Sequence, residues 1–90
     1  MVSGAVGAAG EQPPSGARRQ ELDVRPILAS GGEPFGAIME KVAALEPHEV
    51  LALRTPFDPR PLHRVLGEKG FSRLTRELDS DDFVTEYWRP

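Results

Sequence analysis

Apolar and polar residues alternate along the first part of the chain in a pattern that predicts a strand followed by a helix. Leu22 and Val24 alternate with charged residues, which predicts a strand at about residues 21–25 that ends at Pro26. Residues 27–33 contain two adjacent glycines and are predicted to form a loop. A helix beginning at Pro34 follows, and apolar spacings of three and four residues predict its buried face: Phe35, Ile38, Met39, Val42 and Leu45.

The pattern of apolar and polar residues in the second half of the chain predicts another strand, another helix and a hairpin. Residues 49–54 are mostly apolar and alternating, which is typical of a strand. Asp58 precedes two prolines and is predicted to cap a helix whose apolar face consists of Leu62, Val65 and Leu66. Gly70 ends this helix. Strands at about residues 71–78 and 83–89 are then joined by an acidic turn.

This order of elements predicts one small α+β domain. Strand–helix–strand units are right-handed in nearly all proteins, so both helices are expected on one face of the sheet, which gives a two-layer α/β sandwich. Residues 1–19 are rich in Gly, Ala, Ser and Pro and are predicted to be a disordered tail. Residues 20–90 are therefore expected to form a single domain.

Composition narrows the classes of function. The net charge of -3 gives no electrostatic reason to bind nucleic acid. The sequence has no long apolar run that would span a membrane. The first ten residues lack a basic start and are interrupted by glycines, so we expect no signal peptide and a cytoplasmic location. The chain has no cysteine, which removes thiol nucleophiles and cysteine-based metal sites.

Four segments together resemble a known bacterial family. They are residues 22–26 (LDVRP), residues 33–35 (EPF), residues 54–62 (RTPFDPRPL) and residues 69–71 (KGF). The chain resembles domain-of-unknown-function family 2249, which is related to the TusA and SirA sulfur carriers. The resemblance spans roughly residues 22–89. It implies a β-α-β-α-β-β fold with a mixed four-stranded sheet in the strand order one, two, four, three.

The resemblance also shows what this chain lacks. The sulfur carriers hold a Cys-Pro-x-Pro motif at the start of their first helix, where the helix dipole lowers the thiol pKa. The matching residues here are Glu33, Pro34, Phe35 and Gly36. The proline at the helix start is retained and the cysteine is absent, so sulfur transfer by this chain alone is excluded.

Several polar residues are predicted to meet at the edge where the first two strands end and both helices begin. Pro34 and Pro59 mark the two helix starts, and helix N-termini and arginines together suit an anionic group. The predicted ligand or partner edge consists of Arg25, Glu33, Arg54, Thr55, Asp58 and Arg60. In the alternative interpretation, Asp58 only caps its helix and the arginines pair with Glu33 and Asp58.

The remaining candidate residues are aromatic or are histidines. Tyr87 and Trp88 alternate in the last strand, so one of them is expected near the uncovered sheet face, where an exposed aromatic side chain would mark a contact surface. The alternative is that these side chains are covered or half-buried. His48 and His63 lack the spacing of a metal site and are predicted to be surface residues, so we expect no metal.

The sequence therefore favours binding over catalysis. An enzyme needs a nucleophile, a base or a metal in a cleft, and this chain offers scattered carboxylates, two histidines and no thiol, so neither catalysis nor a cofactor is expected. We expect a small accessory domain that binds another protein or a small anionic ligand, in the bacterial redox or sulfur-related metabolism that the resemblance implies. The alternative is a scaffold subunit that assists a sulfur-transfer enzyme whose thiol comes from a partner.

Overall fold

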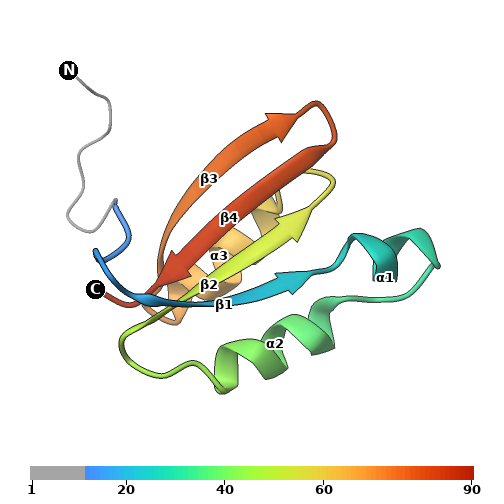
Figure 1. Ribbon diagram of the computed structural model, residues 1–90. Helices are drawn as coiled ribbons and strands as arrows, with labels where there is room; N and C mark the ends of the chain where they lie inside the picture. The colour runs from blue at the N-terminus through green and yellow to red at the C-terminus, as the bar shows by residue number, and fades with distance from the viewer. Residues whose placement is uncertain (1–11) are drawn as a thin grey trace.

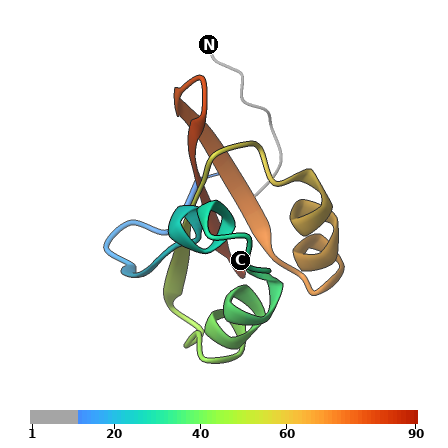
Figure 2. The same ribbon diagram turned by 90° about the vertical axis from the view of Figure 1, so that its right-hand side faces the viewer.

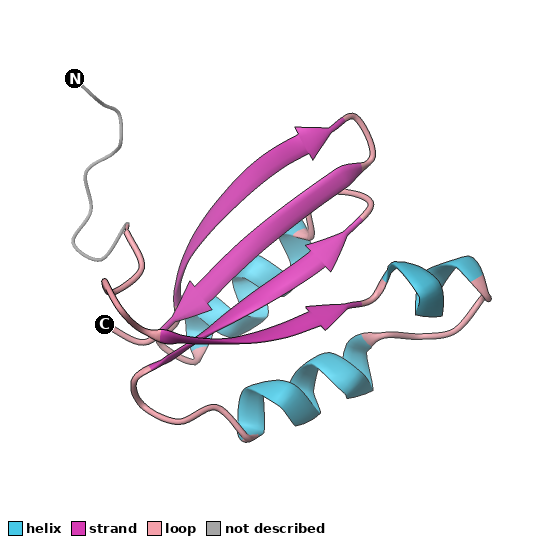
Figure 3. Ribbon diagram, viewed as in Figure 1, coloured by secondary structure: helices cyan, strands magenta, loops and turns pink. Residues whose placement is uncertain are grey.

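The structure, a computed structural model, describes residues 12–90, which contain four strands and three helices (Figures 1 and 3). In chain order they are β1 (Arg18–Asp23), α1 (Arg25–Ala29), α2 (Phe35–Ala43), β2 (Glu49–Thr55), α3 (Arg60–Glu68), β3 (Ser72–Asp79) and β4 (Asp82–Trp88). Of the predicted disordered tail, residues 1–11 lie outside the described residues. The predicted boundary at residue 20 is wrong, because Arg18 and Arg19 belong to β1, which begins three residues earlier than predicted. No helix within residues 12–90 is long and apolar enough to cross a membrane.

The four strands form one mixed sheet in the order β1-β2-β4-β3. β1 is parallel to β2, whereas β4 is antiparallel to both β2 and β3. The predicted α+β class, the mixed four-stranded sheet and its strand order are therefore confirmed. The positions of β2, α3, β3 and β4 along the chain also agree with the prediction to within a residue or two.

The short helix α1 was not predicted, because its residues fall mostly in the segment expected to be a loop. Pro26 lies in its first turn, where a missing N–H costs no helical hydrogen bond. Gly31 has a φ of 82°, a left-handed conformation that lets the next amide donate to the Ile27 carbonyl at 2.8 Å. Ile27 and Leu28 pack against the core. A helix of five residues is too short to show the apolar periodicity on which the prediction depended.

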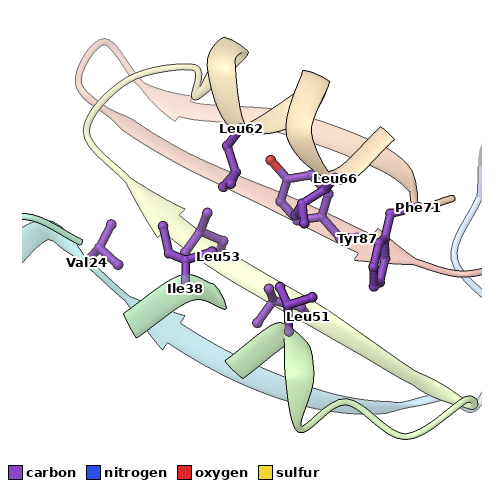
Figure 4. Packing of buried hydrophobic residues seen from close by; sticks show 9 residues of the cluster. Val24, Ile38, Leu51, Leu53, Leu62, Leu66, Phe71 and Tyr87 are labelled. Atoms are coloured by element: carbon purple, nitrogen blue, oxygen red, sulfur yellow. The ribbon is translucent and has the colours of Figure 1, made fainter. Parts of the chain in front are cut away.

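The hydrophobic core lies between the sheet and the helices, which cover one face of it (Figure 2). Leu51 and Leu53 of β2 are fully buried at its centre, and α2 and α3 pack against them from the same side (Figure 4). The buried cluster consists of Val24, Ile38, Val42, Leu51, Leu53, Leu62, Leu66, Phe71 and Tyr87. One predicted core residue is wrong: Phe35, in the first turn of α2, is 46% exposed.

The sheet face opposite the helices is covered by long charged side chains. Glu86 of β4 is 3% exposed and forms ion pairs with Arg19 of β1 and Arg76 of β3. Because β2 lies between β1 and β4, the Arg19 side chain has to cross β2 to reach Glu86. Together with the buried Trp88 on the same face, this crossing side chain helps to cover Val50 and Ala52, which no helix covers.

Neither Tyr87 nor Trp88 of β4 offers the exposed contact that the sequence predicted. Tyr87 is paired in register with Leu51, faces the helices and is 1% exposed. Trp88 faces the other way and is only 2% exposed. The expectation of an exposed aromatic side chain on this strand is therefore wrong, and the alternative of covered rings is correct.

Replacing Leu66 by Ala tests the packing of α3 on the sheet. Leu66 is 0% exposed, so its truncation removes buried apolar contacts and leaves a cavity. We expect Leu66→Ala to lower the free energy of unfolding by about 2–5 kcal/mol, measured by urea denaturation. The matched control is Leu78→Ala, at a residue that is 51% exposed, for which we expect a change of less than about 0.5 kcal/mol. Equal effects at the two positions would contradict this description of the core.

Candidate functional site

The N-termini of α2 and α3 lie at the same edge of the sheet, as the sequence predicted. Both helices run opposite to the strands they connect, so both begin beside the carboxyl ends of β1 and β2. Pro34 and Pro59, at the two helix starts, line one shared cavity. The prediction that the two proline-started helices face the same rim is therefore confirmed.

This cavity is an apolar groove between the two helix starts. Its volume is about 190 Å³. Phe35 and Phe57 are 46% and 50% exposed and border its open side. The lining residues are Val24, Leu28, Glu33, Pro34, Phe35, Ile38, Leu53, Thr55, Phe57, Pro59, Pro61, Leu62 and Val65. We refer to this set as the apolar groove.

Two polar side chains line the apolar groove, and both are bonded within the chain. Glu33 accepts a hydrogen bond from the Phe35 backbone N–H at 2.9 Å, which satisfies an amide at the start of α2. The Thr55 hydroxyl donates to the Phe57 carbonyl at 2.5 Å and so holds the loop that follows β2. What remains open to a binding partner is therefore mainly apolar surface.

The first turn of α3 offers few free amides to an anion. The Arg60 N–H donates to the Asp58 carbonyl at 2.8 Å, and the Leu62 N–H donates to the Pro59 carbonyl at 3.0 Å. Pro61 has no N–H to offer. Because anion sites at helix N-termini depend on free backbone donors, this helix start lacks the feature on which the predicted anion site relied.

The two arginines at the strand ends are neutralised by aspartates of the same chain. Arg54 donates two hydrogen bonds to Asp82, at 2.7 and 2.8 Å. The Arg25 guanidinium donates two to Asp23, at 2.9 and 2.8 Å, and a third to Asp82 at 3.3 Å. The Arg54 guanidinium lowers the pKa of Asp82, and Arg25 lowers the pKa of Asp23. The alternative that the arginines pair within the chain thus describes the geometry better, but its partners were wrong for these two residues. Arg25 and Arg54 pair with Asp23 and Asp82, not with Glu33 or Asp58.

Asp58 does not cap α3 with its side chain, contrary to the prediction. The N-cap residue is Pro59, and no side chain bonds to the cap. Asp58 instead lies 2.6 Å from His63 Nε2, and its other oxygen is 3.6 Å from the exposed Arg60. His63 is 7% exposed, so the prediction of a surface residue is wrong for it, whereas His48 is exposed. The Asp58 carboxylate therefore forms a hydrogen bond with a buried histidine and does not cap the helix.

His63 lies in the middle of a buried hydrogen-bonded chain, which consists of Asp58, His63 and Tyr87. The Tyr87 hydroxyl is 2.8 Å from His63 Nδ1. Because a carboxylate only accepts, Nε2 carries the proton toward Asp58, and Nδ1 accepts from the tyrosine. Burial lowers the pKa of His63, which keeps the ring neutral, and burial also raises the pKa of Tyr87.

This buried chain is suited to a structural role. The Tyr87 ring is 1% exposed, so its hydroxyl cannot meet a substrate at the surface. The chain joins the loop before α3 to the helix itself and to β4, and it thereby fixes the wall of the apolar groove that Phe57 and Pro59 form. Within residues 12–90, no three His, Cys, Asp or Glu side chains are grouped so that they could hold a metal ion.

Comparison with known proteins identifies the family. The family model described as "Uncharacterized conserved protein (DUF2249)" matches residues 21–89. The chain belongs to this family. The DUF2249 match includes all the residues of the apolar groove and of the buried Asp58–His63–Tyr87 chain. No curated protein and no solved structure matches the chain.

The structure divides the six residues of the predicted edge among three places. Glu33 and Thr55 line the apolar groove, Arg25 and Arg54 belong to the ion pairs with Asp23 and Asp82, and Asp58 and Arg60 lie at the start of α3. Residues 54 and 55 are separated because neighbouring strand residues point to opposite faces.

Three contributors to this edge were missed by the sequence reasoning. Phe57 was not singled out, although a large apolar residue in a proline-rich loop was a usable signal. Asp82 was taken for a turn residue, and only the antiparallel pairing of β4 with β2 brings it to Arg54. His63 gave no sign of burial in the sequence beyond its place beside the apolar residues of α3.

The burial of His63 leads to a prediction about how the stability of the fold depends on pH. His63 has a lowered pKa in the folded state, so the unfolded chain binds the proton more readily. The contribution of the neutral His63 ring to the free energy of unfolding is fully present above pH 6.5. It is lost as the pH falls from 6.5 toward the lowered pKa that His63 has in the folded protein. We expect the free energy of unfolding, measured by urea denaturation between pH 8 and 5.5, to decrease in that direction. In His63→Gln this decrease should be smaller, and an unchanged slope would contradict the assignment.

Proposed function

We propose that this chain is a small non-catalytic binding domain whose apolar groove receives one or two large apolar side chains from a segment of a partner protein. The observation that carries the proposal is the groove between two helix starts, bordered by two half-exposed phenylalanines, Phe35 and Phe57. Exposed aromatic residues beside an apolar depression are characteristic of sites where a partner inserts an anchor residue.

The size of the groove favours a protein segment over a cofactor or a metabolite. Small-molecule sites usually have volumes of about 300–1,000 Å³, whereas this groove has about 190 Å³. A space of that size suits a Leu, Met or Phe side chain. The small anionic ligand that the sequence also suggested has less support, because Arg25 and Arg54 already pair with carboxylates.

The negative charge at the groove favours a partner segment with a basic residue beside the inserted apolar side chain. Glu33 contributes a carboxylate to the groove, no lysine or arginine lines it, and the whole chain carries a net charge of -3. We therefore propose a partner segment in which an apolar residue is followed or preceded by Lys or Arg. The resemblance to sulfur carriers supports placing such a partner in redox or sulfur-related metabolism.

A second candidate is a scaffold subunit for a sulfur-transfer enzyme. It is favoured by the position of Glu33 and Pro34, which match the Cys-Pro of the sulfur carriers and line the apolar groove. In this case the inserted segment would bring the thiol that this chain lacks. Purified partners that include rhodanese-type or cysteine desulfurase proteins would favour this candidate, whereas haem or hemerythrin-like proteins would favour the redox context.

A peptide-display selection on the full chain tests the proposed site. We expect enriched peptides to carry one or two large apolar residues next to a basic one, and to shift the amide resonances of groove residues in ¹H–¹⁵N spectra. Phe57→Ala should weaken their binding about tenfold or more, since anchor contacts dominate such interfaces.

Leu78→Ala is the matched control for this experiment, because Leu78 is 51% exposed, like Phe57, and lies on β3 away from the groove. It should leave peptide binding unchanged. Selected peptides whose binding is insensitive to Phe57→Ala, or whose shifts map to other surfaces, would rule the groove out.

A further inference from the structure

The strand β3 is an open edge of the sheet. It is the last strand in the order β1-β2-β4-β3, and within residues 12–90 it pairs with β4 alone. At eight residues it is longer than β1, the strand at the other edge. The outer side of such a strand presents backbone N–H and C=O groups that a further strand can join.

The charges along β3 are complementary to those of a second, antiparallel copy of the same strand. Directly opposed residues in an antiparallel pair point to the same face of the sheet. Only registers that keep this alternation can join the two sheets into one. In the register centred on Thr75, Arg73 lies opposite Glu77 of the second copy, and Glu77 lies opposite its Arg73. A register centred on Arg76 would instead place two arginines opposite each other.

The residues that this register brings together are free to make those contacts. Ion pairs occupy Arg19, Arg25, Arg54 and Arg76, whereas among residues 12–90 none involves Arg73 or Glu77. Both side chains are exposed.

The same register improves the apolar contacts of β3. Leu78 is 51% exposed and lies at the register shift between Glu77 and Asp79, and this register would bring it near Ser72 and the partly buried Leu74 of the second copy. Pairing would thus cover one of the three most exposed large apolar side chains of the described chain.

We propose that this chain forms a symmetric dimer by antiparallel pairing of β3 with β3 of a second copy, about a two-fold axis at Thr75. The two sheets then form one continuous sheet, in which two Arg73–Glu77 pairs fix the register. One strand pair buries less surface than a standard protein interface, so the dimer is weak, with a Kd on the order of 10–100 μM. The dimer leaves the apolar groove free, and it is independent of the proposed function.

Charge reversal on the full chain tests this dimer by sedimentation equilibrium. Arg73→Glu alone, or Glu77→Arg alone, places like charges opposite each other twice and should weaken self-association about tenfold or more. An equimolar mixture of the two variants should associate at least as well as the wild type, because every opposed pair is then Glu with Arg. Glu40→Arg, at an exposed residue of α2, is the control and should leave the dimer unchanged.

A cross-link supplies a second readout. The chain has no cysteine, so Thr75→Cys introduces a single thiol at the proposed axis. Opposed residues of antiparallel strands have Cα atoms about 4.5–5.5 Å apart, within the range of a disulfide, so mild oxidation should give a covalent dimer. Glu40→Cys, whose thiol lies on α2 away from the proposed axis, should give far less covalent dimer.

Three results would overturn the proposal. The first is a wild-type chain that stays monomeric at 1 mM, in which case the charges and the irregular pairing near Glu77 and Asp79 protect the edge from association. The second is a dimer that persists in both charge-reversal variants, which would place the interface elsewhere. The third is a mixture of the two variants that fails to associate although each is folded by circular dichroism.

Discussion

The parallel pairing of β1 with β2 is the constraint on which the rest of the molecule depends. Parallel neighbours cannot be joined by a tight turn, so the chain must return along one face of the sheet through α1 and α2. The second crossover, through α3, returns on the same face, because both connections share one handedness (Figure 2). Two helices therefore begin at the carboxyl edge of β1 and β2, and the apolar groove is the space between their first turns.

The plane of the sheet then separates two kinds of surface at that edge. Arg54 points away from the helices and joins Arg25, Asp23 and Asp82 in a set of ion pairs. Thr55, the next residue, points toward the helices and lines the apolar groove. Because the positive charges are neutralised within the chain, this edge presents apolar surface to a partner in place of net charge. This separation is the physical basis for proposing a protein segment, and not an anion, as the binding partner of this edge.

Buried polar contacts fix the elements around the groove. The neutral ring of His63 lies between the half-exposed carboxylate of Asp58 and the Tyr87 hydroxyl, so that the buried polar atoms of the histidine and the tyrosine are both hydrogen-bonded. This chain of hydrogen bonds positions the loop that carries Phe57. On the opposite face, Glu86 is held by Arg19 and Arg76, yet its Oε1 atom is buried without a hydrogen bond. Such ion pairs add little net stability, because the cost of removing the charges from water offsets their attraction.

The sequence by itself determined the order and most of the positions of the strands and longer helices, because period-two and period-three-to-four patterns and the placement of prolines and glycines are local properties. It also placed both prolines, Pro34 and Pro59, at one edge, since each helix follows the carboxyl end of one of two parallel strands. It did not determine α1, whose five residues are too few to show a period.

Only the tertiary structure decided which partner each polar residue meets. His63 is buried because β4 brings Tyr87 beneath α3, and Arg54 is neutralised because the same strand brings Asp82 to its side. Both contacts join residues more than twenty positions apart in the chain. A local pattern carries no information about them, since each depends on which strands lie side by side in the sheet.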